Sequence, residues 1–177
     1  MLLAAAAELD AFGYGAFSID RVASNAGVHK TTVYRRWPTK AELIADAASL
    51  QSEENVPIPD TGSFRTDLQQ LARQVAALVG APVNGGRTRA VVGAALTSPE
   101  LAQSMQRYWL DRICQCAVIV QRGIDRGELP PDADANLITE SVIGPIWVRL
   151  LLTGEPISEN LADATAALVA AGAVAQR

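Results

Sequence analysis

The sequence has one histidine, two cysteines and few aromatic residues, and these shortages exclude several kinds of chemistry. With His29 as the only histidine, the chain shows no pairing of a nucleophile with a base and no spacing typical of metal ligands. The pair Gly85-Gly86 is too short a signal for a phosphate-binding loop. The sequence therefore argues against an enzyme, and it predicts neither a cofactor nor a bound metal.

The two cysteines, Cys114 and Cys116, fall on largely opposite sides of a helix, so they cannot easily pair with each other. A reduced compartment fits this pattern, with a redox switch or a metal site at the thiols as the alternative. No apolar run approaches the roughly 20 residues of a membrane span. The start, Met1-Leu2-Leu3, lacks the basic residues of a signal peptide. We therefore expect a cytoplasmic protein without membrane contact.

Positive charge is also scarce, since the net charge is −4, but the cations are unevenly placed. The only two lysines, Lys30 and Lys40, lie with Arg35 and Arg36 in residues 29–40, which contain no acid. Residues 51–177 hold ten arginines against fourteen acids. Because the charge of a whole chain does not set the local potential, this short segment is suited to bind phosphate groups.

Hydrophobic residues make up 49% of the chain and recur with helical spacing, whereas no strand-like alternation persists beyond a few residues. Two prolines and a glycine in residues 53–62 preclude continuous helix there. We place a domain boundary at this break, between a head at residues 1–52 and a body at residues 53–177. A loop is expected at 82–86, and helices are expected at 2–12, 19–25, 30–36, 40–50, 64–79, 87–96, 99–127, 135–153 and 158–175.

The segment that starts at Ser18 has the pattern of a helix-turn-helix. Ser18 is a suitable N-cap for the helix at 19–25, and Gly27 predicts a tight turn. The helix at 30–36 ends at Trp37, because the residue before a proline avoids helical geometry. Proteins of this kind place their second helix in a DNA major groove about 12 Å wide.

Helical geometry sorts the side chains of that second helix into two faces. With about 100° of rotation per residue, Val33 and Trp37 fall together and face inward. Arginine binds guanine through two hydrogen bonds, threonine contacts a thymine methyl or a phosphate, and Tyr34 and Lys40 have the reach for phosphate oxygens. A solvated basic face is the ordinary alternative, but it does not explain the glycine turn and the lack of acids together. The outward side chains are Thr31, Thr32, Tyr34, Arg35 and Arg36.

Residues 4–47 resemble the DNA-binding domain of the TetR (tetracycline repressor) family. The resemblance is carried by Ser18-Ile19-Asp20-Arg21-Val22-Ala23 and by residues 26–43, which read Ala-Gly-Val-His-Lys-Thr-Thr-Val-Tyr-Arg-Arg-Trp-Pro-Thr-Lys-Ala-Glu-Leu. The remainder is similar to one C-terminal subgroup, at 60–63 with 67–68, at 126–130 and at 149–156.

This resemblance implies about nine helices, arranged as a three-helix helix-turn-helix head and a helical-bundle body that binds ligand and dimerises. It implies a homodimer joined by the last two helices, a double-stranded DNA operator, and release from DNA by a small molecule. No basic arm precedes the first helix, so the chain is expected to begin late relative to the family. His29 stands where a small serine is common. The predicted DNA-binding residues are Ser18, His29, Lys30, Thr31, Thr32, Tyr34, Arg35, Arg36 and Lys40.

Large side chains in the middle and late helices indicate either ordinary core or the lining of an apolar pocket. Each one alone favours core, but together the rare aromatics favour a pocket, and a kink at Pro145 would help to open it. Arg112 and Arg149 are either polar anchors of that pocket or surface cations. The candidate pocket residues are Met105, Tyr108, Trp109, Ile113, Cys116, Ile143 and Trp147.

The alanine-rich last helix needs a close partner to bury its apolar side chains, and a symmetric dimer provides one. The candidate interface residues are Leu150, Leu161, Leu168 and Val169.

We therefore expect a ligand-responsive DNA-binding transcriptional regulator, which represses from a palindromic operator until a small apolar or amphipathic molecule releases it. A constitutive DNA-binding regulator and a helical dimerisation module without an effector are the alternatives. The ligand signal is expected to cross residues 53–62 through packing of the helix at 40–50 against the first body helices.

Overall fold

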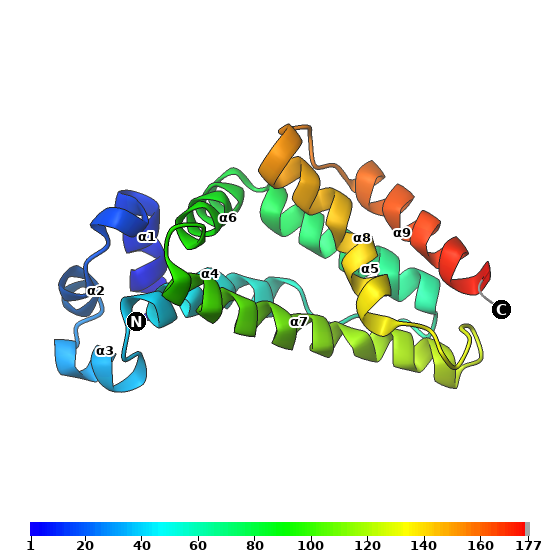
Figure 1. Cartoon of the computed structure of the whole chain (residues 1–177), viewed down its shortest axis with the longest axis horizontal. Coiled ribbons are helices and arrows are strands. Elements are labelled where there is room, and N and C mark those ends of the chain that lie inside the picture. The colour runs from blue at the N-terminus through cyan, green and yellow to red at the C-terminus, as the bar shows by residue number, and fades with distance from the viewer. Residues whose placement is uncertain (176–177) are drawn as a thin grey trace. The chain divides into compact units, whose positions relative to one another are not determined.

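The computed structural model describes residues 1–175, with side chains placed for residues 1–48 and 56–174. Every regular element in this range is helical, which confirms the expected all-α class (Figure 1). The helices are α1 (Leu2–Ala16), α2 (Ile19–Asn25), α3 (Lys30–Arg36), α4 (Lys40–Asn55), α5 (Phe64–Gly80), α6 (Pro82–Ala95), α7 (Pro99–Asp125), α8 (Ala135–Val148), the π-helical turn η1 (Arg149–Thr153) and α9 (Glu159–Ala175).

The chain folds into two compact units. The head unit contains Met1–Glu54 together with Pro82–Tyr108, and the body unit contains Asn55–Ala81 together with Trp109–Arg177. The first crossing between the units lies close to the boundary expected at residue 53. However, α6 and the first part of α7, both expected in the body, pack with the head unit. The functional division into residues 1–52 and 53–177 stays a prediction.

Local capping explains how the head helices begin. The Oγ of Ser18 accepts a hydrogen bond from the backbone N–H of Arg21 at 3.4 Å, so Ser18 caps α2 as expected. The Oγ1 of Thr39 accepts one from the N–H of Glu42 at 3.2 Å, so Thr39 caps α4. Gly13, with φ of 67°, interrupts α1 where the sequence predicted its end, and one further helical turn follows to Ala16.

The loop expected at residues 82–86 was wrong, because α6 begins at Pro82. Proline is favoured at the first position of a helix, where its missing N–H and fixed φ cost nothing. Gly85 is buried inside α6 and does not form a turn. The residue Ala81 alone separates α6 from α5.

Each unit has its own aliphatic core. The head core includes Val22, Val33, Trp37, Leu43 and Ile44, all at most 3% exposed. In the body, α5 packs against α9 and α8. The body core residues include Phe64, Leu68, Leu71, Ile119, Val142, Ile146 and Ala166.

Polar contacts join the start of α5 to the end of α7. The buried carboxylate of Asp67 accepts hydrogen bonds from the backbone N–H and the hydroxyl of Thr61, at 2.6 and 2.7 Å. Ser63 begins α5 without a side-chain cap, and Glu128 instead accepts the N–H of Phe64 at 2.8 Å. These contacts give a structural role to two segments that resemble the TetR subgroup, around residues 60–68 and 126–130.

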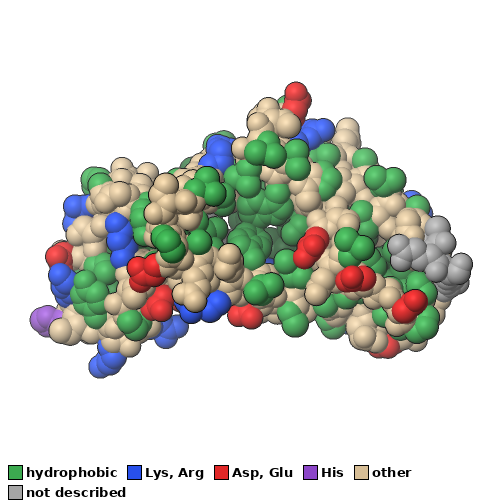
Figure 2. Space-filling view, in the orientation of Figure 1, with side chains coloured by type: hydrophobic (Ala, Val, Ile, Leu, Met, Phe, Trp, Pro, Cys, Tyr) green, Lys and Arg blue, Asp and Glu red, His purple; other side chains and the backbone are tan. Residues whose placement is uncertain are grey.

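The segment of α8 and η1 is apolar but poorly covered. Residues Ala135–Thr153 are long and apolar enough to cross a membrane by length and composition alone, with a mean hydropathy of 1.3, but only 28% of that window is buried. The expectation from the sequence that no such segment exists was therefore too strict. Glu140 and Arg149 interrupt the apolar run, but they do not lower its mean hydropathy below that of a membrane span. Hydrophobic side chains are visible over α8 in Figure 2.

Candidate nucleic-acid interface

The turn between α2 and α3 is built as the sequence predicted. Gly27 has φ of 66°, a left-handed conformation that favours glycine. The backbone N–H of Val28 donates to the carbonyl of Ala23 at 3.0 Å, which closes the turn. The short turn and the cap at Ser18 fix the direction in which α3 leaves α2.

The inner face of α3 anchors the helix to the head core. Val33 is fully buried and Trp37 is 3% exposed, which confirms the inward orientation expected from helical geometry. The indole N–H of Trp37 donates to the carboxylate of Asp46 on α4 at 2.7 Å. Thus the inner face of α3 is held both by apolar packing and, at its C-terminal end, by a hydrogen bond to α4.

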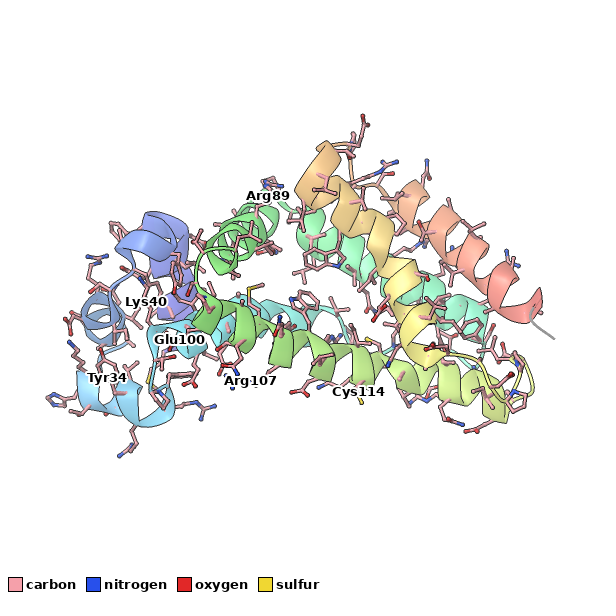
Figure 3. The ribbon with its side chains drawn as sticks, in the orientation of Figure 1. Tyr34, Lys40, Arg89, Glu100, Arg107 and Cys114 are labelled. Atoms are coloured by element: carbon pink, nitrogen blue, oxygen red, sulfur yellow. The ribbon has the colours of Figure 1, made fainter. Side chains whose placement is uncertain are left out.

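The outer face of α3 is exposed and carries no acidic side chain. Thr32 is half-buried, and Tyr34 is 41% exposed (Figure 3). The structure therefore brings the predicted side chains onto one outward surface, which offers hydroxyl groups, a phenol and guanidinium groups. The other exposed members of this surface are His29, Lys30, Thr31, Arg35 and Arg36.

The cations on this surface differ in how far they are already engaged. Lys30 pairs with Asp20 on α2 at 2.8 Å, and the hydrogen bond to that carboxylate raises the pKa of Lys30. The guanidinium of Arg36 lies over the ring of Trp37 at 5.1 Å. Arg35 makes no ion pair or hydrogen bond with any residue that the structure describes. Arg35 is thus the cation on α3 most available to a nucleic acid.

Lys40 is placed differently from the other predicted phosphate ligands. Its Nζ donates to the backbone carbonyl of Tyr14 at 2.5 Å and lies 4.6 Å from the centre of the Tyr14 ring (Figure 3). Burial lowers the pKa of Lys40. The ammonium group therefore holds the segment after Gly13 against the start of α4, and its contact with phosphate stays a prediction.

An important residue of the head, Glu8, was missed by the sequence analysis. Glu8 is 2% exposed and accepts hydrogen bonds from Arg21 Nε at 2.8 Å, Arg21 Nη2 at 2.5 Å and the N–H of Ser18 at 3.0 Å. The hydrogen bond from Arg21 lowers the pKa of Glu8 more than burial raises it. The sequence signal that could have identified Glu8 was the position of an acidic residue on the same face of the first helix as the apolar Ala5 and Leu9.

The candidate pocket residues divide between the two units. Met105 and Tyr108 belong to the head unit, and the other five belong to the body unit. There, the rings of Trp109 on α7 and Trp147 on α8 meet edge to face, with centroids 4.9 Å apart. Cys116 is buried, which raises the pKa of its thiol. Ile143 is half-buried against the body core, and Ile113 is half-buried on α7.

The two arginines considered as pocket anchors instead contact backbone. Arg112 is 8% exposed and donates to the carbonyl of Val56 and to Gln115. Arg149 donates to the carbonyl of Pro156 at 2.5 Å. Both therefore stabilise chain segments within the body unit.

The candidate interface residues are unequally accessible. Leu168 on α9 is 75% exposed, whereas Leu150 is 4% exposed and belongs to the body core. Leu161 and Val169 are half-buried against that core. The sequence analysis also missed Val148 and Leu152, which are 45% and 80% exposed at the end of α8 and in η1.

Known proteins match both parts of the chain. Residues 2–47 match the family described as bacterial regulatory proteins, tetR family, and residues 58–169 match the tetracyclin repressor-like C-terminal domain. The chain is 32% identical over 151 residues to the HTH-type transcriptional regulator AqdR of Rhodococcus erythropolis, covering 85% of this chain and 72% of that protein.

Two further similarities cover most of the chain. It is 33% identical over 147 residues to a DNA-binding transcriptional repressor, TetR, of Mycobacteroides abscessus, covering 80% of this chain and 75% of that protein. A crystal structure of a TetR family transcription regulator superposes with a TM-score of 0.84 and 28% identity, covering 97% of this chain and 94% of that one.

The buried carboxylate of Glu8 predicts how the stability of the head depends on pH. Because the pKa of Glu8 is lowered by folding, its stabilisation is fully present above the unfolded value of about 4.3 and is lost as pH falls through the folded value. Glu8→Gln should lower the melting temperature by several degrees at pH 7, and the difference from the parent should disappear below both values. Thermal unfolding followed by circular dichroism measures this.

The matched control is Glu140→Gln, which neutralises an exposed glutamate on α8. It should melt like the parent at every pH. A Glu8→Gln variant that is as stable as the parent at pH 7 would contradict the role given to this carboxylate.

Proposed function

Because the chain belongs to the tetR family of bacterial regulatory proteins and is a helix-turn-helix transcriptional regulator, we propose that it represses transcription as a homodimer. In this proposal α3 reads a palindromic operator, and a small apolar molecule bound in the body unit releases the DNA. The observation that carries the proposal is the outer face of α3, which is exposed, acid-free and anchored by Val33 and Trp37. Since operator DNA lies in the cytoplasm of a bacterium, the protein acts there.

The side chains of α3 suit separate tasks on DNA. Arg35 is exposed and uncommitted within the described residues, so it is assigned to a base edge, where guanidinium forms two hydrogen bonds with guanine. Thr31 and Tyr34 are assigned to neighbouring bases or phosphates. Ser18 keeps its hydroxyl hydrogen for a phosphate oxygen, because its Oγ acts as an acceptor in the α2 cap.

Removal of the Arg35 side chain tests this assignment. Arg35→Ala should weaken binding to the operator by about 1–3 kcal/mol, which is roughly 5- to 150-fold in Kd, and should leave the melting temperature unchanged. An operator selected from a pool of random DNA and a fluorescence anisotropy titration provide the measurement.

Arg89→Ala is the matched control, because Arg89 is an exposed arginine in the same unit but on α6 (Figure 3). It should bind the operator like the parent protein. Equal affinities of the parent and Arg35→Ala would remove Arg35 from the recognition surface.

Uncovered apolar side chains on α8, η1 and α9 support the homodimer. It is unusual for several leucines on neighbouring helices to lie exposed to solvent. Here Leu137 is 55% exposed, Leu152 is 80% exposed and Leu168 is 75% exposed. A second copy of the chain would cover them through a symmetric contact of the same two helices. Two heads joined in this way reach two half-sites about 34–36 Å apart, which explains the expected palindrome.

A charge on this surface should prevent dimerisation. Leu168→Glu should give monomers in light scattering at micromolar concentration, and these should lose most affinity for the palindrome. Leu110→Glu places the same charge on a leucine of α7 that is 68% exposed, and it should stay dimeric. A parent protein that is itself monomeric under these conditions would refute the interface.

Three features of the body unit support an apolar effector with a hydrogen-bond donor. The contact between Trp109 and Trp147 joins α7 to α8 with large apolar surfaces. Burial of Cys116 indicates weakly hydrated surroundings on α7. On α5, the Oε1 of Gln74 is buried and accepts no hydrogen bond within the described structure, and a ligand donor would satisfy it. A constitutive regulator without an effector is the second candidate.

Tryptophan fluorescence separates these two candidates. In a Trp37→Phe background, an effector found in a library of apolar compounds should shift the emission and lower operator affinity. Coupling of 1–3 kcal/mol corresponds to a roughly 5- to 150-fold change. Trp147→Ala should weaken binding of the effector while the DNA affinity without effector stays unchanged. If no compound alters emission or DNA affinity, the protein is a constitutive binder.

A further inference from the structure

The head unit contains an ion pair to which the proposed function assigns no role. Arg87 on α6 donates from Nε to Asp10 Oδ1 at 2.7 Å and from Nη2 to Asp10 Oδ2 at 2.5 Å. The Arg87 side chain is 7% exposed and that of Asp10 is 31% exposed. Two parallel hydrogen bonds fix both the distance and the orientation of the partners, and low exposure limits their screening by water and salt. Thus α6 is fixed to α1 in one geometry.

A second contact joins the same part of α1 to the start of α7. The hydroxyl of Tyr14 lies 3.0 Å from the Oγ of Ser98, which also accepts the backbone N–H of Leu101 at 3.4 Å at the start of α7. The carbonyl of Tyr14 is held by Lys40 at 2.5 Å. The segment after the kink at Gly13 is therefore tied both to α4 and to α7.

Among the described residues, the ion pair between α4 and α7 is weaker, while Leu101 of α7 shares the apolar head core with Leu43 and Ile44 of α4. Glu42 and Arg107 approach to 3.9 Å, and the Arg107 side chain is 60% exposed, so solvent screens this pair. The route expected from the sequence, through packing of α4 against the first body helices, is therefore joined by polar contacts from α1 that are shorter and better buried than the Glu42–Arg107 pair. Together with the apolar head core, these contacts hold residues 82–108 in the head unit.

The path of the chain explains why these contacts matter for the position of α3. The chain crosses between the two units three times, within α4, between α5 and α6, and within α7. Apolar packing in the head core, which includes Val91 of α6 and Leu101 of α7, also restrains α1 and α4, but it fixes orientation less sharply than the polar contacts from α1 to α6 and α7 do. With them, the elements on the head side of all three crossings move as one unit with α3.

We propose that the Asp10–Arg87 ion pair and the Tyr14–Ser98 hydrogen bond determine the operator spacing that the dimer accepts. The inference rests on the proposed function, since it needs two heads on one palindrome. Arg87 and Ser98 touch no base and act as positioning residues for α3. A head held at all three crossings has a narrow range of positions, so its partner head meets the second half-site at high effective concentration at only one spacing. A head without these two contacts relies on apolar packing and on the chain itself, and it samples a wider range of spacings.

Spacing selectivity is measured with three DNA probes: the selected palindrome, a single half-site, and the palindrome with one or two base pairs inserted at its centre. The variant is Arg87→Gln, which keeps a polar side chain but cannot form the ion pair. It should bind the palindrome about tenfold more weakly than the parent and the half-site equally well. Its preference for the palindrome over the inserted probes should largely disappear. Arg89→Gln, on the same helix, should keep the selectivity of the parent.

The readouts separate a positioning role from a structural one. If Arg87→Gln loses affinity for the half-site as much as for the palindrome, the ion pair merely stabilises the head, and the proposal is overturned. Unchanged spacing selectivity also overturns it. If Arg87→Gln does not fold, Arg87→Lys and Ser98→Ala take its place, because each removes the geometry of one contact with a smaller change.

Failure of the proposed function gives a different result. A parent protein that binds no palindrome more tightly than a half-site refutes the dimeric repressor and this inference together. A parent that binds the palindrome with sharp spacing, beside variants that do the same, refutes this inference alone.

Discussion

The geometry of the head depends on the buried carboxylate of Glu8. A buried charge without partners destabilises a fold strongly, so Glu8 must keep the hydrogen bonds from Arg21 and from the N–H of Ser18. Those bonds join α1 to the start of α2, at the residue that also caps α2. Because the turn at Gly27 is short, the direction of α2 determines that of α3. An ion pair far from the outer face of α3 thereby positions the residues on that face.

The basic segment of the head is divided between structure and recognition. Lys30 pairs with Asp20, Lys40 holds the carbonyl of Tyr14, and Arg36 lies over Trp37, whereas Arg35 is uncommitted among the described residues. The local excess of cations is therefore less available to phosphate than the composition suggests. Engaged cations restrict the conformations of the surface before DNA arrives, which reduces the entropy lost on binding.

The body unit combines a well-packed inner side with an uncovered apolar surface. On α9, Ala162, Ala166 and Ala170 are buried, and their small side chains allow close packing against α5. Leu168 on the same helix projects into solvent. The neighbouring segment of α8 and η1 has the average hydropathy of a membrane span although much of it is exposed. In the proposed homodimer, a second copy of the chain covers that surface.

The structural features that the sequence alone predicted depend on residues close together in the chain. The features that it did not predict depend on contacts between distant residues. The cap at Ser18, the turn at Gly27 and the inward side of α3 each depend on residues within a few positions, so periodicity and capping preferences predicted them. The family motif also indicated that nearly the whole chain resembles a transcriptional regulator. Local patterns gave a false loop at 82–86, because the same proline is also a favoured first residue of a helix.

Only the tertiary structure decided which distant residues meet. Glu8 lies near Arg21, Lys40 near Tyr14, Arg87 near Asp10, and Trp109 near Trp147, and no sequence period links the members of these pairs. The same holds for the grouping of α6 with the head unit and for the burial of Leu150, which the sequence analysis had placed at an interface. A helical pattern specifies which face of a helix is apolar, but it does not specify which other helix covers that face, because this depends on the packing of the whole chain.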